Sequence, residues 1–209
     1  MFPMRLWPLA LFFSLALAAR FAAFSVEPFG PQRLNLDTGV TTLPQGGVLV
    51  DNENGLRLRA DYIEYKEGAF IRARVLELLS EKETFRAQTL EHDIPKGEAR
   101  FTSLVFANAD FKDLRAERAL ALFNEDIVVL KGQVRAASPD LQADVLVVDL
   151  KARQALVLGS FLYREGRATL RGQGPSARLH LRFAGGKVQA STKLPPEAPR
   201  LAAYANRLP

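Results

Sequence analysis

The 209-residue sequence has no cysteine and only two histidines, His92 and His180. Without thiols, the chain cannot form disulfides, thiolate zinc sites or iron–sulfur clusters, and it has no cysteine nucleophile. Two imidazoles leave little room for metal or triad chemistry. We therefore expect neither a metal nor a cofactor. The core must be stable without covalent cross-links, which favours a regular, well-packed architecture.

Extreme charge and repeated long apolar runs are also missing. Hydrophobic residues make up 48% of the chain, charged residues 24%, and the net charge is +5. These values exclude a disordered chain and a protein with several membrane spans. Basic residues alternate with acids, as between Arg57 and Glu67, so a mixed surface is favoured over a nucleic-acid-binding stripe. Against a typical domain size of roughly 150 residues, the length allows one domain or at most two small ones.

Residues 1–26 have the pattern of an export segment. Arg5 precedes an apolar run from Leu6 to Ala19, and residues 16–18 (Ala-Leu-Ala) fit the small-x-small requirement of signal peptidase. The run is shorter than the ~20 residues that a membrane span needs. Apolar residues nevertheless continue beyond it, so residues 6–26 could instead be an uncleaved membrane anchor. Both alternatives place the rest of the chain outside the cytoplasm.

Two segments have the composition of connecting chain. Residues 27–47 are rich in proline and glycine, and residues 193–209 form a proline-rich tail. We expect the first to be a linker and the second to lie outside the folded core. The remaining residues, 48–192, are expected to form the domain.

Within this domain the sequence repeats. An apolar-polar-small-polar motif begins at Leu58, Phe85, Leu114, Leu141 and Leu170. The intervals between copies are 27, 29, 27 and 29 residues. A second motif, apolar-x-small-x-apolar, begins at Ile71, Phe101, Leu130, Val157 and Ala184. Each unit therefore has two segments of alternating polarity, which predicts two strands with one buried face.

One segment conflicts with this pattern, because residues 113–123 are rich in helix-forming side chains. The equivalent residues 141–149 have the composition of a strand, and the repeat register therefore predicts a strand in both places. Turn residues such as Asn54-Gly55 and Glu67-Gly68 separate the predicted strands. We expect an all-β domain of about five two-strand repeats, with about ten strands after residue 47.

These units resemble the OstA-like family, which includes the periplasmic lipopolysaccharide-transport proteins LptA and LptC. The likeness rests on Leu141-x-Ala143-Asp144 with Asp149, followed by small-x-Val, and it covers residues 48–192. Units with Gln88 or Gln173 in place of the acid depart from the pattern. The resemblance implies a β-jelly roll of stacked antiparallel strands with a hydrophobic groove. It also implies a cargo of lipopolysaccharide or another acylated envelope lipid. Implied partners are other β-jelly roll transport proteins and an inner-membrane ABC transporter.

The repeats suggest where such a cargo would lie. If the buried faces of the strands oppose one another, large residues flank small ones, which fits either a filled core or an apolar channel. Holding about a dozen acyl carbons could contribute of order 10 kcal/mol, at ~0.8 kcal/mol per buried CH₂ and before ordering costs. The resemblance favours the channel. The candidate groove residues are Leu58, Ala60, Tyr62, Ile71, Val75, Phe85, Phe101, Val105, Leu114, Leu130, Gly132, Val134, Leu141, Val145, Val157, Gly159 and Phe161.

Polar residues of the repeats are expected on the outside. Arg59, Arg86 and Arg115 share one repeat position, where they are either solvated or form a ladder for phosphorylated head groups. His92 is expected on the surface near a turn, and His180 on the polar face of a strand.

The sequence therefore predicts a non-enzymatic periplasmic lipid carrier or bridge, which passes its cargo towards the outer membrane. We find no nucleophile elbow and no phosphate-binding loop that would indicate an enzyme. Addition of a partner jelly roll at a sheet edge would extend the groove. Two alternatives remain open: an LptC-like subunit anchored through residues 6–26, and a structural or polysaccharide-binding β-solenoid with a filled core.

Overall fold

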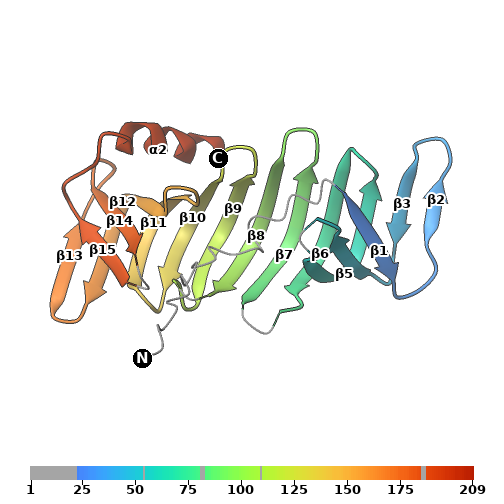
Figure 1. Cartoon of the computed structure of the whole chain (residues 1–209), viewed down its shortest axis with the longest axis horizontal. Helices are drawn as coiled ribbons and strands as arrows, with labels where there is room; N and C mark the ends of the chain where they lie inside the picture. The colour runs from blue at the N-terminus through green and yellow to red at the C-terminus, as the bar shows by residue number, and fades with distance from the viewer. Residues whose placement is uncertain (1–22, 54, 81–82, 109, 185–186) are drawn as a thin grey trace, which may run out of the picture.

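The computed structural model describes residues 23–53, 55–80, 83–108, 110–184 and 187–209. In these residues fifteen strands form one antiparallel sheet, in which most strands pair with the next one along the chain (Figure 1). The predicted all-β fold, a β-jelly roll of stacked antiparallel strands built from two-strand repeats, is confirmed. The predicted export segment lies outside the described residues, except for its last four.

The structure has the following elements. The strands are β1 (Phe24–Pro28), β2 (Arg33–Asn35), β3 (Val40–Leu43), β4 (Gly47–Asp51), β5 (Arg57–Lys66), β6 (Phe70–Leu78), β7 (Thr84–Asp93), β8 (Glu98–Ala107), β9 (Leu114–Leu122), β10 (Ile127–Ala136), β11 (Asp140–Asp149), β12 (Gln154–Glu165), β13 (Ala168–Gly172), β14 (Arg178–Ala184) and β15 (Lys187–Ser191). The helix α2 (Ala198–Tyr204) and a 3₁₀ turn (Ala205–Arg207) follow.

The repeat motifs fall on successive strands. The first motif lies on β5, β7, β9, β11 and β13, and the second begins on β6, β8, β10, β12 and β14. The segment with helix-forming residues is strand β9, as the repeat register predicts. Tertiary pairing with β8 and β10 therefore overrides local propensity in this segment.

Each long strand changes its buried face near its middle. In β6, Ile71 and Ala73 are buried, the next two residues are exposed, and burial resumes at Leu76. In β12 the buried residues Val157 and Phe161 flank a bulge where the register with β11 shifts. An extra residue in a strand moves every later side chain to the opposite face. Because the strand also bends at this point, both of its halves direct apolar side chains to the same interior.

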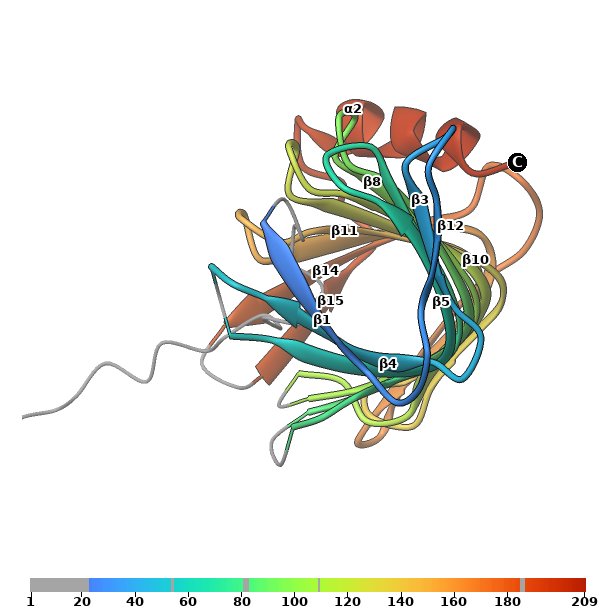
Figure 2. The same ribbon diagram turned by 90° about the vertical axis from the view of Figure 1, so that its right-hand side faces the viewer.

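The sheet is therefore curled, and the two halves of each long strand face each other (Figure 2). We call the halves that end at turns 67–69, 94–97, 123–126 and 150–153 arm A. The halves that end at connections 79–83, 108–113, 137–139 and 166–167 are arm B. Strands β1 and β4 continue arm B beyond β5, and β14 continues arm A beyond β12. One cluster of buried apolar residues lies between the arms, from Leu43 and Leu49 on β3 and β4 to Phe183 on β14.

Aromatic pairs connect the arms across this interior. Phe85 in arm B contacts Phe101 in arm A edge-to-face, with 5.3 Å between ring centroids. Phe24 contacts Tyr65 at 5.4 Å near the β1 end of the sheet, and Phe111 contacts Phe183 at 5.2 Å near the other end. The side chains of the two arms thus pack directly against each other at three places along the sheet.

A second apolar cluster lies on the outer face of arm A. Leu120, Val129 and Leu156 point outward there, and α2 covers them with Leu201. These strands are buried on both faces, which accounts for their continuous apolar runs. Arg200, which lies on this helix, also forms an ion pair with Asp149, with 2.9 Å between Nη2 and Oδ2. The predicted proline-rich tail at 193–209 therefore includes a docked helix, with Pro199 in its first turn.

The linker expected at residues 27–47 also contains regular secondary structure. Residues 27–47 contain the end of β1, all of β2 and β3, and the first residue of β4. Pro28 ends β1, and Pro44 directly follows β3, so neither interrupts the middle of a strand. The sheet therefore begins well before residue 48, and the prolines mark strand ends instead of unstructured chain.

Candidate functional site

Most of the predicted groove residues lie in the interior between the arms. Eleven of the seventeen belong to the interior cluster and are buried: Leu58, Ala60, Ile71, Phe85, Phe101, Leu114, Leu130, Val134, Leu141, Val157 and Phe161. They come from β5 to β12, so they extend along the sheet instead of gathering at one point.

The other six, Tyr62, Val75, Val105, Gly132, Val145 and Gly159, lie outside the interior cluster. Val75 is 47% exposed, and Val145 packs against the outer cluster beneath α2. The ring of Tyr62 lies under the guanidinium of Arg74, 4.7 Å from it. A two-residue alternation through the whole strand predicts these positions as interior, whereas the buried face changes at the bend. Interior positions after the bend, such as Ile63 and Leu76, were therefore missed.

The bend also explains the acidic residue of the first motif. Asp144 on β11 accepts a hydrogen bond of 2.6 Å from the backbone N–H of Ser160 on β12. The preceding residue, Gly159, has φ +80°, and a Cβ there would lie 2.5 Å from Asp144 Oδ2. The acid of one strand thus contacts the backbone of a glycine bulge in the next strand, on the outer face.

The neighbouring unit also places an acid beside a bulged glycine, but there the hydrogen bond comes from a side chain. Gly132 has φ +81°, and a Cβ there would clash with the Glu117 carboxylate. Gln133 donates a 2.6 Å hydrogen bond from Nε2 to Glu117 Oε1. Gly132 and Gly159 therefore stabilise the bend of the strand, and a side chain there would point outward and away from the interior.

The interior beside Phe111 is tightly packed. A cavity of only about 10 Å³ lies there, lined by Leu104, Phe106, Phe111, Leu114, Val128, Leu130 and Val148. This is at or below the space that one water molecule needs. An acyl chain could enter this part of the molecule only if the arms or side chains moved.

A polar contact crosses between the arms next to this cavity. Asp110, in the 108–113 turn of arm B, lies 3.9 Å from Arg153, in the 150–153 turn of arm A. Its side chain is 3% exposed, and burial raises its pKa although the guanidinium acts in the opposite direction. Asp110 Oδ2 and Arg153 Nε and Nη2 are buried without a hydrogen-bond partner. Sequence patterns gave no signal for this contact, because both residues lie in turns.

His92 is not on the surface as predicted. It is 2% exposed and packs edge-to-face against Phe123 at 5.3 Å. Burial lowers its pKa to about 4, with a smaller opposing effect from Asp93. The reason is the same change of face, which occurs in β7 at Gln88 and Thr89. His180 lies on the polar side of β14 as expected, with a 2.9 Å hydrogen bond to Gln154.

The repeated arginines lie on the outer face of arm B. They lie in one row of directly opposite residues across neighbouring strands. The row runs through Arg59, Glu77, Arg86, Val105 and Arg115. Arg86 forms an ion pair with Glu77 at 2.7 Å, and Arg115 with Asp113 at 2.9 Å. Exposed pairs of this kind contribute little to stability. Two of the three predicted ladder positions thus already have acidic partners.

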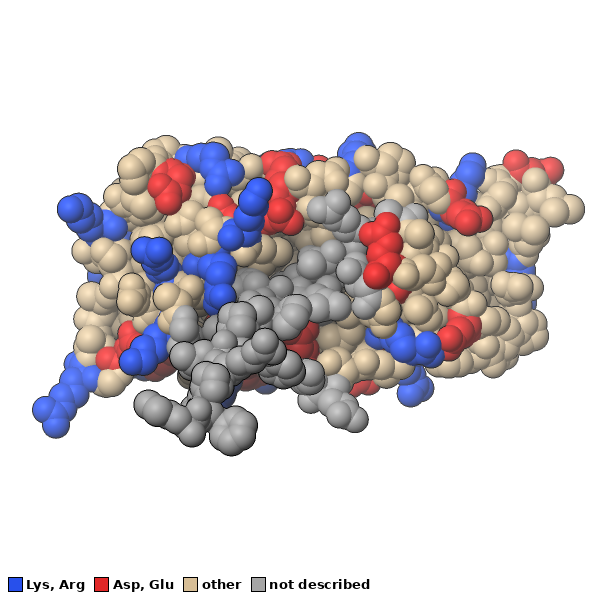
Figure 3. All heavy atoms as spheres, viewed as in Figure 1, with Lys and Arg blue, Asp and Glu red and all other residues tan. Residues whose placement is uncertain are grey.

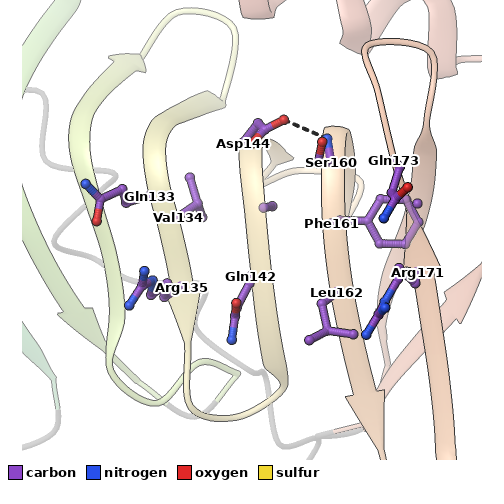
Figure 4. A pocket seen from close by; sticks show the side chains of 12 residues that line it. Gln133, Val134, Arg135, Gln142, Asp144, Ser160, Phe161, Leu162, Arg171 and Gln173 are labelled. Carbon is purple, nitrogen blue, oxygen red and sulfur yellow. Dashed lines mark hydrogen bonds between the residues drawn. The ribbon is translucent and has the colours of Figure 1, made fainter.

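The row continues into an outer pocket of about 380 Å³. There Arg135, Gln142, Leu162 and Arg171 lie side by side on neighbouring strands (Figure 4). Figure 3 shows Lys and Arg side chains gathered at the β13–β15 end, with acids spread along the face. On this face the basic side chains are therefore unevenly distributed.

Two absences apply to the described residues alone. No group of three or more His, Asp or Glu side chains in this part of the chain is arranged to hold a metal ion. No helix in the same residues is long and apolar enough to cross a membrane.

The chain has a weak likeness to known proteins among solved structures. No protein-family model and no curated protein sequence matches the chain. Among solved structures, it is similar to LptH from Pseudomonas aeruginosa, described as the LptA-homologous periplasmic component of the conserved lipopolysaccharide transport device. The identity is 11% and the TM-score 0.29, and the match covers 85% of this chain and 99% of LptH. A likeness this weak establishes neither fold nor function for this chain.

Proposed function

We propose that the chain is a non-enzymatic periplasmic carrier of lipopolysaccharide or a similar acylated envelope lipid. The acyl chains would lie between the arms, and the lipid would be passed on towards the outer membrane. One observation carries this proposal: a single apolar cluster extends between the arms along nearly the whole sheet, from β3 to β14. Burial of each CH₂ of a cargo there is worth ~0.8 kcal/mol before ordering costs.

Loading requires the arms to separate. The strands are continuous through the bend, whereas the arms meet through side chains such as Phe24 with Tyr65 and Phe85 with Phe101. An aromatic pair contributes ~0.5–1.5 kcal/mol beyond its burial, so an entering acyl chain can replace such contacts one by one. The bend would then act as the line about which the arms move apart.

Transfer to a neighbour would use the edges of the sheet. In the described sheet β2 pairs with β3 alone, and β13 and β15 are the last strands at the other end. Addition of a second β-jelly roll at either edge would make the two apolar interiors continuous. The inner-membrane ABC transporter implied by the sequence resemblance would stand at the start of such a chain.

Native mass spectrometry of the protein purified from its own envelope tests this function. We expect a mass shift that matches an acylated glycolipid, lost on delipidation and restored by incubation with the extracted lipid. Phe101→Trp, which overfills the interior, should reduce rebinding, whereas Arg86→Gln on the outer face should not. A protein that carries no lipid, and rebinds none after incubation, would contradict the carrier function.

Two alternatives have support of their own. The tight packing beside Phe111 favours a structural or polysaccharide-binding protein with a filled core, which would bind no acylated lipid in the same experiment. The apolar residues 6–26 support an LptC-like subunit anchored in the inner membrane. Amino-terminal sequencing of the envelope protein separates these forms, because a start near Ala19 excludes the anchor.

A further inference from the structure

Two adjacent residues, one acidic and one aromatic, reach from arm B to arm A. Asp110 lies 3.9 Å from Arg153, and the ring of Phe111 lies 5.2 Å from that of Phe183. Their contact partners on arm A, Arg153 and Phe183, are neighbours, because the N–H of Phe183 donates a 2.9 Å hydrogen bond to the carbonyl of Arg153. Arm A thus presents a guanidinium directly beside an apolar surface.

The guanidinium at this place is poorly satisfied. Its Nε and Nη2 atoms are buried, and in the described structure neither has a hydrogen-bond partner. The Asp110 carboxylate stands at the outer limit of an ion pair, and its Oδ2 also lacks a hydrogen bond. Burying charged groups is costly unless they are paired at close range. An anion that approached Arg153 more closely would therefore be a better partner than Asp110.

The acidic and aromatic residues are presented by a local turn. Asn108 Oδ1 accepts hydrogen bonds of 2.9 Å from the backbone N–H groups of both Asp110 and Phe111. Lys112 is joined to Ser138 in the next turn of arm B by a 2.8 Å backbone hydrogen bond. These bonds hold the turn to arm B, so the contacts with Arg153 and Phe183 are made across to the opposite arm.

We infer that Arg153, Phe183 and the interior beside them form an entry site for an anionic amphiphile, and that Asp110 and Phe111 occupy this site when no ligand is bound. The ligand class is a phosphate group joined to an alkyl or acyl chain. Its phosphate would replace the carboxylate of Asp110, since arginine binds phosphate through two parallel hydrogen bonds. Its chain would replace the ring of Phe111, which lines the interior cavity of about 10 Å³.

This inference rests on the proposed carrier function and specifies where the cargo is first held. The outer-face arginines are less suited to that role, because their side chains lie on the opposite side of the sheet from the apolar interior. Arg86 and Arg115 also have carboxylate partners at 2.7 and 2.9 Å. Arg153 combines two buried nitrogens that have no hydrogen-bond partner with immediate access to the interior.

Isothermal titration calorimetry of the full chain tests the site with three probes: dodecyl phosphate, the uncharged dodecyl maltoside, and inorganic phosphate. The two dodecyl probes are used below their critical micelle concentrations. We expect Phe111→Ala to bind both dodecyl probes about tenfold more tightly than wild type, because the competing ring is gone. Asp110→Asn should tighten binding of dodecyl phosphate alone. Arg153→Gln should weaken dodecyl phosphate at least tenfold and leave dodecyl maltoside unchanged.

Arg115→Gln is the matched control, since it removes an arginine from the outer face. The inference is overturned if Arg115→Gln weakens dodecyl phosphate as much as Arg153→Gln does. It is also overturned if Phe111→Ala does not tighten binding, or if inorganic phosphate binds as tightly as dodecyl phosphate. Thermal unfolding checks that each variant is folded, and Phe111→Leu, expected to show a smaller gain, replaces Phe111→Ala if that variant unfolds.

The results also separate this inference from the proposed function. Suppose that dodecyl maltoside binds wild type, and that neither Arg153→Gln nor Asp110→Asn changes the affinity for dodecyl phosphate. The carrier function then stands and the entry site fails. If neither dodecyl probe binds wild type or any folded variant, both fail.

Discussion

At the bend of a long strand, one residue pair determines which face the rest of the strand presents. Asp144 accepts the N–H of Ser160, and Gly159 adopts φ +80° beside it. A left-handed backbone costs a non-glycine residue roughly 1–2 kcal/mol, so glycine is favoured at this position. In this unit Asp144 and Gly159 thus have a shared role in shaping the backbone, and neither of them lines the interior.

Gly159→Ala tests this role against a glycine of similar backbone but open surroundings. Gly166 has φ +56°, and a Cβ there would meet nothing within 4 Å. Both substitutions carry the backbone cost, but Gly159→Ala also displaces Asp144 and weakens a charge-assisted hydrogen bond worth ~1.5–3 kcal/mol. We expect urea unfolding to show Gly159→Ala less stable than Gly166→Ala by about 1–3 kcal/mol. The excess should largely disappear in an Asp144→Ala background, and equal losses in both backgrounds would contradict the pairing.

His92 gives the protein a dependence on pH. Its pKa is lowered by burial from 6.5 to about 4, so folding requires the neutral imidazole. This contribution to stability is complete above pH 6.5 and is lost as the pH falls towards 4. Between pH 7.5 and pH 4.5 we expect a loss of about 2–3 kcal/mol from this group. His92→Phe should unfold in urea with that part of the pH dependence removed. If the variant and wild type lose the same free energy, His92 is not the titrating group.

At the scale of elements, the repeat predicted strands β5 to β12 well. Spacings of 27 and 29 residues set the order of the strands and correctly overrode the helix-forming residues of β9. The pattern did not give the change of face, because a bulge adds a residue without altering the composition of the strand. The exposure of Val75 and the burial of His92 both follow from that single feature.

The ends of the chain were harder to predict for a different reason. Strands β2 and β3 have three and four residues, too few to show a period, and prolines and glycines surround them. The helix α2 has seven residues and follows two prolines. A signal was nevertheless present in the unbroken apolar runs at 127–130 and 155–158, which indicate strands buried on both faces. Strands buried on both faces need a second layer over their outer face, and α2 in the tail forms that layer on arm A.

Leu201→Ala tests whether α2 is held to arm A by its apolar contact. Leu201 is fully buried in the outer cluster, and truncation of a buried leucine costs ~2–5 kcal/mol. Since Leu201 lies on a terminal helix, we expect this loss to appear as local undocking. Amide hydrogen exchange in residues 198–207 should accelerate at least tenfold, while exchange in β7 and β8 stays unchanged. Ala203→Ser on the exposed side of the helix is the control, and equal acceleration in both variants would contradict the docking.

At the scale of the whole molecule, the curled sheet has two different ends. Strand β2 stands at one end, where Phe29, Leu34 and Leu36 are 50%, 58% and 86% exposed. The other end carries the basic side chains seen near β13–β15 (Figure 3). Apolar residues on an unpaired edge normally promote association, and proteins protect edges that are not used. The β2 end is therefore the better candidate for strand addition.

Replacing Leu34 and Leu36 together by lysine tests that role. Lysine on an edge strand opposes pairing, while both positions are exposed and contribute little to the core. We expect sedimentation velocity to show concentration-dependent association of wild type, weakened at least tenfold in the double variant with unchanged unfolding. Leu79→Lys, which replaces a leucine 46% exposed in a turn of arm B, controls for general stickiness. Equal weakening by Leu79→Lys would assign the association to scattered apolar contacts. A wild type that remains monomeric at every concentration would exclude self-addition through β2 and leave this edge to a different jelly roll.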